Sequence, residues 1–279
     1  MSRRLIGLLM RCIKCRKKEV ERAVKHRVRI EKERIRAEEE KICTEKEREI
    51  YRQLMECARY IVKTIDGKGK ANSSSHKRQC LLELVYAILR PLQSELFLHF
   101  LEGGGMIECD FFEPCVMDFM RGQRSEQNEL EFNASKHALC LNKDAIFACT
   151  WDSGKYLDAL CSYGDCRTPK WELWKQQNQE GKPQCDRHDI ILWLPWCIAK
   201  VGANGNHSIA AGISSSICAP LKPDRIYDMS FILDLIEVDE KGEYYRDRKT
   251  NEKIAEVKSG HRAAAFEIGR LIRECENAT

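Results

Sequence analysis

The chain has 279 residues, of which 43% are hydrophobic and 32% charged, so it can form one large globular domain or two modest ones. No segment is long and apolar enough to cross a bilayer, and the apolar run Leu5–Met10 is too short for a secretory signal. The net charge of +4 is unevenly spread, because residues 1–30 hold 11 Lys/Arg against 2 Asp/Glu and the remainder sums to −5.

The fifteen cysteines are scattered along the chain and odd in number, and no convincing secretory signal precedes them. Disulfides are rare in the cytosol, where unpaired cysteines behave as small hydrophobic side chains. We therefore expect a cytoplasmic protein whose cysteines are mostly reduced and buried.

Residues 14–65 contain no glycine or proline and are rich in Glu, Lys and Arg, which predicts one long helix. Its apolar positions recur at spacings near four or seven and form a thin seam, typical of a coiled coil or of a helix laid on a partner. The members of this seam are Val20, Val24, Val28, Ile35, Ile42, Ile50, Leu54, Ala58 and Ile61.

The basic start of this helix is a candidate contact for nucleic acid or an anionic membrane. A solvated basic helix is the alternative, because charge alone is weak support for a function. The candidate phosphate-gripping side chains are Arg16, Lys17, Lys18, Arg22, Lys25, Arg27 and Arg29.

A polar linker, residues 66–75, separates this region from a strongly apolar helix over residues 79–101. We expect Pro91 to kink or divide that helix, and Gly103–Gly105 to end it. The pattern predicts three parts: a basic helical arm (1–66), a helical region (67–130) and an α+β domain (131–279).

The last part mixes strand and helix patterns. We expect a short strand at 137–141, a helix at 155–163, a polar insertion at 164–187, and two strands at about 189–194 and 196–201. A short helix follows, then a strand or strand pair over 225–238, a hairpin turn at 240–243 and a closing helix over 261–275. The fold class is therefore α+β, with a long helical region before a small mixed sheet.

A turn rich in glycine and asparagine, Gly202–Gly205, leads from the second of these strands into the short helix. A helix N-terminus has unpaired N–H groups and partial positive charge, so it binds phosphate readily. Gly205, Asn206, His207 and Ser208 are the candidate phosphate-binding residues, with Lys155 as a compensating charge. The alternative is that Asn206, His207 and Ser208 merely cap the helix, with His207 packed inward.

His207 is also a candidate catalytic acid or base, since its ordinary pKa lies near neutrality. Asp228 could orient His207 or hold a metal ion. The competing interpretation, which we favour for Asp228, is an Asx turn before a strand running from Phe231 to Val238.

Cys161, Cys166, Cys185 and His188 have a spacing that could hold Zn²⁺ and pin the 164–187 insertion. The first gap is wide and cysteines are common in this chain, so unliganded cysteines are the simpler interpretation. The five tryptophans could stack nucleobases, although burial is the default for Trp193 and Trp196 on their strands.

The order of elements in residues 137–238 resembles the ParB/sulfiredoxin-like fold. The matching pieces are Leu139–Asp144, Trp151–Lys155, Leu157–Gly164, Pro195–Val201 and Gly205–Ala211. The segment is also similar to a family of uncharacterised prokaryotic proteins with the same Leu-Trp-Leu-Pro-Trp and Gly-Asn-His-Ser-Ile strings.

The resemblance implies nucleotide or phosphate binding at the Gly205–Ser208 turn, DNA cleavage in some relatives, and a prokaryotic mobile element or antiviral defence locus. Two departures matter. Ser208 stands where the family has an arginine, which removes a bidentate phosphate donor. Asn206 stands where sulfiredoxins carry a reactive cysteine, which argues against sulfiredoxin chemistry.

We therefore expect a nucleic-acid-acting or nucleotide-binding protein, with nuclease or NTPase activity and Mg²⁺ or a nucleoside triphosphate as the cofactor implied. The alternative is a non-enzymatic module whose long helix docks a partner protein or a second copy. A third hypothesis is a membrane-surface effector anchored by residues 1–18.

Overall fold

A computed structural model describes residues 3–67, 73–104, 109–164, 188–215 and 220–277 of the chain; at 3–25, 27, 28, 73, 162–164 and 220 it describes the backbone alone. The chain divides into two compact units, Met1–Lys46 and Glu47–Thr279. The boundary therefore falls inside the first helix, and residues 67–130 belong to the same unit as the α+β part, so the three predicted parts do not coincide with these units.

The first unit consists of the N-terminal part of α1 (Arg3–Asp66), a 64-residue helix that confirms the predicted long helix. From Arg29 to Cys43 every side chain is exposed. Among them, the seam residues Ile35 and Ile42 are 50% and 63% exposed, so this part of the seam is uncovered, whereas Ala58, near the C-terminal end of the seam, is fully buried. Of the seven basic candidates, Arg29 forms an ion pair with Glu33 at 3.3 Å, and the other side chains lie outside the described residues.

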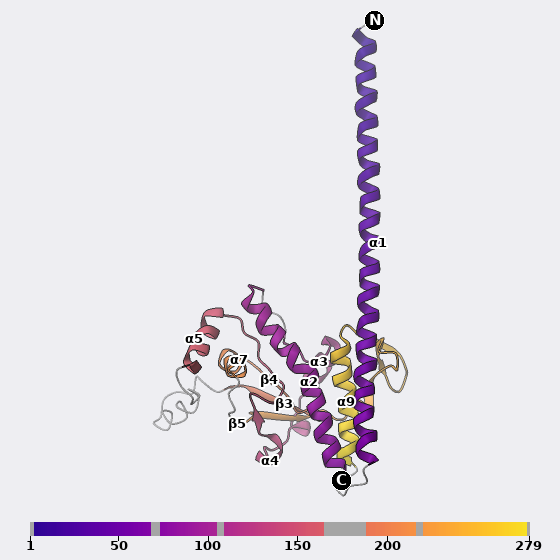
Figure 1. Cartoon of the computed structure of the whole chain (residues 1–279). Coiled ribbons are helices and arrows are strands. Elements are labelled where there is room, and N and C mark those ends of the chain that lie inside the picture. The colour runs from indigo at the N-terminus through magenta and orange to yellow at the C-terminus, as the bar shows by residue number, and fades with distance from the viewer. Residues whose placement is uncertain (1–2, 68–72, 105–108, 165–187, 216–219, 278–279) are drawn as a thin grey trace. The chain divides into compact units, whose positions relative to one another are not determined.

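The second unit contains the end of α1 together with α2 (Ser73–Leu101) and α9 (Gly260–Asn277), which lie side by side (Figure 1). α2 continues through Pro91, so of the two expected effects of this proline, a kink or a division, the division does not occur. A proline inside a helix costs about 3 kcal/mol, and each buried leucine contributes roughly 2 kcal/mol. The buried face formed by Leu81, Val85 and Leu89 therefore keeps the helix continuous.

The central sheet has four strands in the order β2-β4-β3-β6: β2 (Ile146–Phe147), β4 (Ile198–Val201), β3 (Ile190–Leu194) and β6 (Arg225–Asp228). The β2–β4 and β3–β6 pairs are parallel, and β3 runs antiparallel to β4. The predicted strands at 189–194 and 196–201 are therefore confirmed as β3 and β4, with slightly shorter bounds.

Two smaller sheets complete the β structure. β1 (Leu139–Cys140) pairs with β5 (Pro220–Leu221), and β7 (Ile236–Val238), β8 (Tyr244–Asp247) and β9 (Lys253–Glu256) form an antiparallel meander. The predicted hairpin turn at 240–243 joins β7 to β8, with Gly242 at φ +69°. The chain is thus α+β, as predicted.

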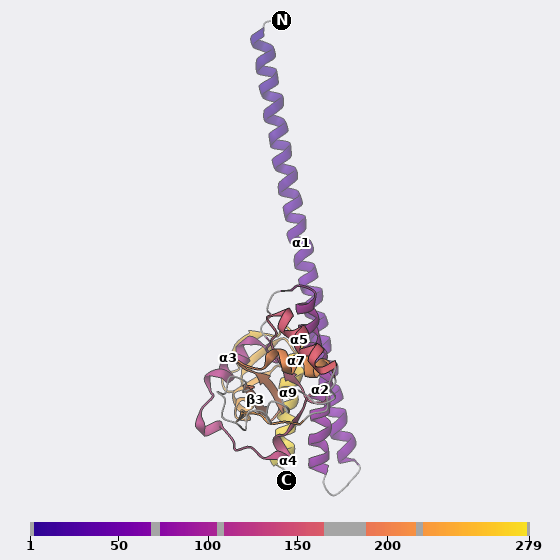
Figure 2. The same ribbon diagram turned by 90° about the vertical axis from the view of Figure 1, so that its left-hand side faces the viewer.

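Shorter helices connect these strands. They are α3 (Pro114–Gly122), the 3₁₀ helix η1 (Glu126–Asn128), α4 (Ala134–His137), α5 (Ser153–Gly164), α7 (Asn206–Ser214) and α8 (Ile232–Leu235). α5 packs against α7 (Figure 2). The predicted strand Phe231–Val238 was wrong in its first half, because the buried Ile232 and Leu233 enter α8 before β7 begins.

Core side chains lie on both faces of the central sheet. Neighbouring residues of a strand point to opposite faces. Trp193 of β3 packs against Phe111, with ring centroids 6.4 Å apart, while its neighbour Leu192 faces the side of α2. Trp196 stacks on Phe266 of α9, and its indole N–H donates to the carbonyl of that residue at 3.0 Å. Trp193 and Trp196 are therefore core residues, as predicted, although Trp196 lies in the turn between β3 and β4 and not on a strand.

The cysteines depart from the expected pattern. Cys109 and Cys149 form a disulfide with their Cα atoms 5.6 Å apart. Of the other cysteines whose side chains the structure describes, Cys197 and Cys275 are buried, whereas Cys43, Cys57 and Cys161 are exposed. Among the described helices, none combines the length and apolar character needed to span a bilayer.

Candidate functional site

The predicted phosphate-binding turn folds back on the start of β3. The N–H of Gly202 donates to the carbonyl of Asp189 at 2.6 Å, and the N–H of Asp189 donates to the carbonyl of Asn204 at 3.1 Å. Gly205 then caps α7 with φ +94°, a conformation that favours glycine. A Cβ at Gly205 would overlap the ring of His188, so the close approach that glycine permits is made by that histidine.

Asn206 anchors the turn instead of facing a ligand. Its side chain is buried, its Oδ1 accepts the N–H of Cys149 at 2.7 Å, and its Nδ2 donates to the carbonyl of Gly202 at 2.7 Å. Both polar atoms are satisfied inside the protein. The prediction that Asn206 binds phosphate was therefore wrong for its side chain.

His207 is half-buried against Trp151, which lies just before α5. The ring centroids are 4.4 Å apart with planes at 71°, and Nε2 accepts the N–H of Asp152 at 3.2 Å. This bond assigns the proton of the neutral ring to Nδ1, which has no hydrogen-bond partner among the described residues. Burial lowers the pKa of His207; Asp152 opposes the shift and Lys155 adds to it.

Ser208 completes the turn. Its hydroxyl donates to the carbonyl of Gly205 at 3.0 Å. Nε2 of His188 lies 3.0 Å from the Ser208 hydroxyl oxygen. The N-cap residue of α7 is Gly205, which has no side chain that could accept an N–H group of the first turn. The partial positive charge of this helix N-terminus favours an anion.

Lys155 and Trp151 meet this turn from a distant part of the sequence. Asp152 accepts the N–H of Lys155 at 3.0 Å, just before α5 begins. The side chain of Lys155 is exposed, and its positive charge lowers the pKa of His207. Trp151 is 47% exposed. The structure therefore brings the predicted Lys155 and His207 to the same turn. It also packs Trp151, one of the five tryptophans that could stack nucleobases, against His207.

Asp228 lies at the wrong end of the sheet to serve His207. It pairs with Leu194 at one end of β3, whereas the turn follows Val201, which pairs with Ile190 at the other end. The two ends are about 13 Å apart at 3.3 Å per residue. Asp228 instead accepts the N–H of Ser230 at 2.9 Å, which is the Asx-turn interpretation.

A different ionic contact lies beside the turn. Arg225, at the start of β6, donates to Asp189 at 2.7 Å, next to the carbonyl that Gly202 uses. The sequence pattern contains no signal for this pair, because only the parallel pairing of β3 and β6 brings these residues together.

The predicted zinc set is only half described. Cys166 and Cys185 lie outside the described residues, as do Trp171 and Trp174. Cys161 is exposed, and His188 is bound to the hydroxyl of Ser208. Within the described part of the chain, no three His, Cys, Asp or Glu side chains are grouped so that they could hold a metal ion.

A family model matches residues 29–279, which is most of the chain, and describes a family of unknown function, DUF6710. The chain belongs to the DUF6710 family. The match includes Trp151, Lys155 and the α7 turn, and leaves out six of the seven basic candidates of α1. No curated protein and no solved structure matches the chain. The ParB/sulfiredoxin-like resemblance therefore stays a prediction.

Proposed function

We propose that this DUF6710 protein binds a nucleotide or a nucleic-acid strand at the N-terminus of α7. The binding surface, called the Trp151 site below, consists of Trp151, Lys155, His207 and the first-turn N–H groups of α7. The observation that carries the proposal is the half-exposed indole of Trp151, held edge-on by His207 beside an exposed lysine.

The parts of the Trp151 site suit the two halves of a nucleotide. Stacking of a base on an exposed aromatic ring is worth about 1–3 kcal/mol and tolerates any base. A phosphate fits the uncapped N-terminus of α7 and the ammonium group of Lys155. The neutral imidazole of His207 offers its Nδ1–H as a further donor.

Binding is better supported than turnover. A catalytic role as nuclease or NTPase would rest on His207, whose Nε2 is occupied by the N–H of Asp152 and whose pKa is lowered by burial. Mg²⁺ or a nucleoside triphosphate stays the expected cofactor for that role. The placement in a prokaryotic defence locus rests on the resemblance alone.

The test measures binding of a fluorescein-labelled single-stranded oligonucleotide, and the thermal shift with ATP, CTP and GTP, each with and without Mg²⁺. Trp151→Ala and Lys155→Gln should each weaken binding about tenfold. The matched controls Tyr60→Ala and Lys249→Gln, also exposed, should bind like the wild type. Wild-type affinity in Trp151→Ala, or no binding of any probe, would contradict the proposal.

The basic start of α1 is tested separately in the full chain. Replacing Arg16, Lys17 and Lys18 by glutamine should reduce the salt dependence of oligonucleotide binding and weaken all sequences alike. Nucleotide binding at the Trp151 site should not change. If nucleotide binding falls as well, the two contributions are not independent.

The second candidate function is docking of a partner helix or a second copy along α1. It is favoured by the exposed Ile35 and Ile42, which are one heptad apart. Sedimentation of the wild type and of the Ile35→Glu, Ile42→Glu double variant tests self-association.

For the membrane hypothesis, co-sedimentation with anionic vesicles should depend on residues 1–18, whose side chains lie outside the described part.

A further inference from the structure

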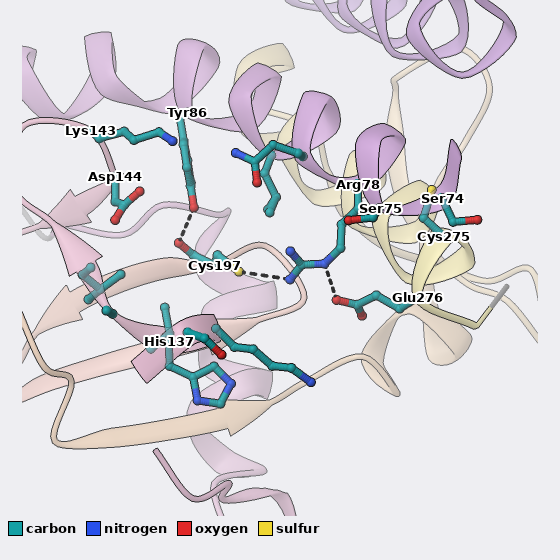
Figure 3. A pocket seen from close by; sticks show the side chains of 17 residues that line it. Ser74, Ser75, Arg78, Tyr86, His137, Lys143, Asp144, Cys197, Cys275 and Glu276 are labelled. Atoms are coloured by element: carbon teal, nitrogen blue, oxygen red, sulfur yellow. Dashed lines mark hydrogen bonds and ion pairs between the residues drawn. The ribbon is translucent and has the colours of Figure 1, made fainter. Parts of the chain in front are cut away.

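A cavity of about 690 Å³ opens where the first turns of α2 meet the α4–β1 segment and the end of α9 (Figure 3). It is called the α2 cavity below. Its volume lies within the range of small-molecule sites, roughly 300–1,000 Å³. Its lining includes three cationic side chains, two carboxylates and one histidine: Arg78, Lys136, Lys143, Asp144, Glu276 and His137.

Arg78 is held in place over the cavity. Its Nε donates to Glu276 at 2.6 Å, and its Nη2 lies 3.6 Å from the sulfur of Cys197. Tyr86 donates to the carbonyl of Cys197 at 3.3 Å, which holds this floor of the cavity against α2. Among the described residues, Nη1 of Arg78 makes no hydrogen bond. A guanidinium fixed in this way has a pre-oriented donor left for an anion.

The positive charge of Arg78 is balanced by Glu276 and not by the neighbouring Cys197. Burial raises the pKa of the Cys197 thiol to about 11, although Arg78 acts in the opposite direction. The thiol is therefore neutral at pH 7, and Glu276 is the acidic partner of the guanidinium. Ser74 and Ser75 line the same side of the cavity in the first turn of α2, where the helix dipole also favours an anion.

The opposite side of the cavity carries Lys143 and Asp144 (Figure 3). Asp144 accepts the N–H of Cys140 at 2.6 Å, and burial raises the pKa of its carboxyl. Lys143 is paired with Glu83 at 3.0 Å. A buried carboxyl that faces a polar cavity is a suitable partner for a hydroxyl group of a ligand.

We propose that the α2 cavity binds a small phosphate monoester with a hydroxylated body. The phosphate lies against Arg78, Ser74 and Ser75, and the body reaches toward Asp144. Glu276 holds Arg78 in the unliganded protein and competes with the phosphate for it. This site shares no residue with the Trp151 site, so it does not rest on the proposed function.

The experiment is calorimetric titration of the full chain with ribose 5-phosphate and with orthophosphate, at an ionic strength held constant with chloride. Arg78→Gln should weaken both ligands about tenfold or more, because a charge-assisted hydrogen bond is lost. Glu276→Gln should tighten both several-fold, because the competing carboxylate is removed. Asp144→Asn should weaken ribose 5-phosphate and leave orthophosphate unchanged.

Two controls use residues outside the cavity. Arg273 lies on α9, as Glu276 does, and forms an ion pair with Asp234 of α8. Arg273→Gln breaks this pair and should not change either affinity. Trp151→Ala should also bind both ligands like the wild type, which separates this proposal from the previous one.

Lys136 lines the cavity and its side chain is exposed, so Lys136→Gln serves as a second cavity variant if Arg78→Gln does not fold.

Each outcome decides the proposal. The absence of binding in the wild type overturns it, and so does wild-type affinity in both Arg78→Gln and Lys136→Gln. Equal affinity for ribose 5-phosphate and orthophosphate overturns the proposed recognition of a monoester and leaves a site for an inorganic anion. Unchanged affinity in Glu276→Gln overturns the proposed competition between Glu276 and the phosphate for Arg78.

Discussion

The imidazole of His207, in α7, lies edge-on to the indole of Trp151, just before α5, with ring centroids 4.4 Å apart. The contact explains why a large aromatic ring stays in place while nearly half exposed, and why the histidine is driven toward its neutral form. An exposed ring that is held rigidly loses little entropy when a base stacks on it. The first prediction follows from this pair.

Trp151→Ala should raise the pKa of His207 toward its ordinary value of 6.5, because water regains access to the ring. In the wild type the folded pKa lies below the unfolded one, so stability is lost as pH falls from above 6.5 through the folded pKa. In the variant this loss should shrink. Titration of the His207 ring signals by NMR measures the effect, and an unchanged pKa would refute the shielding role.

The matched control is Tyr60→Ala, which removes an exposed aromatic ring on α1. It should leave the His207 titration unchanged.

Asn206→Ala should cost about 3 kcal/mol of unfolding free energy, because it leaves the N–H of Cys149 and the carbonyl of Gly202 without their buried partner. Urea denaturation measures the change. Asn204→Ala, two residues earlier and exposed, should stay within about 0.5 kcal/mol of the wild type. Equal costs at the two positions would show that Asn206 does not anchor the turn.

Gly205→Ala should be markedly more destabilising than Gly103→Ala, although both glycines have a positive φ. At Gly103 a Cβ meets nothing within 4 Å, so the cost is backbone strain of about 1 kcal/mol. At Gly205 the Cβ also overlaps the His188 ring, which should bring the cost to about 3 kcal/mol. Thermal unfolding of the two variants compares them, and similar melting temperatures would contradict the close packing of His188.

Glu113 should be a structural residue at the start of α9. Its buried carboxylate accepts the N–H groups of Lys258 and Ser259, at 3.2 and 2.8 Å. Glu113→Ala should cost about 2–3 kcal/mol, whereas Glu113→Gln keeps an acceptor oxygen and should cost less. Glu126→Ala, at an exposed glutamate, should have little effect.

The same residue predicts a pH dependence. Burial raises the pKa of Glu113 above its ordinary value of 4.5, so the folded state holds the proton more tightly than the unfolded state. Its contribution to stability is therefore lost as pH rises through the folded pKa. The stability of Glu113→Gln relative to the wild type should improve from pH 4 to pH 7, and a trend in the opposite direction would show that the carboxylate is favoured in the fold.

Reduction of the Cys109–Cys149 disulfide should lower the unfolding free energy by about 3–4 kcal/mol, given the 40-residue separation of the two cysteines. Urea denaturation with and without a phosphine reductant measures the loss. A Cys109→Ser, Cys149→Ser double variant should show no response to the reductant. If the wild type is also indifferent, the two thiols are not joined in solution.

The sequence by itself determined the elements whose cause is local. The glycine-free charged run predicted α1, the apolar run that Gly103 ends predicted α2, and the hairpin at Gly242 follows from turn chemistry. Such features depend on periodicity and backbone preference within a few residues. The short helix α7 was also expected after its turn, but its N-cap is Gly205 and not one of the candidate capping residues Asn206, His207 and Ser208.

The tertiary structure alone decided which side chains meet. The register of β3 with β6 and β4 separates Asp228 from His207, and packing of α5 on α7 brings Trp151 to His207. Burial of the α2 face likewise outweighs the local preference of Pro91 to break a helix. These outcomes depend on contacts between distant segments, whose free energies a local pattern does not contain.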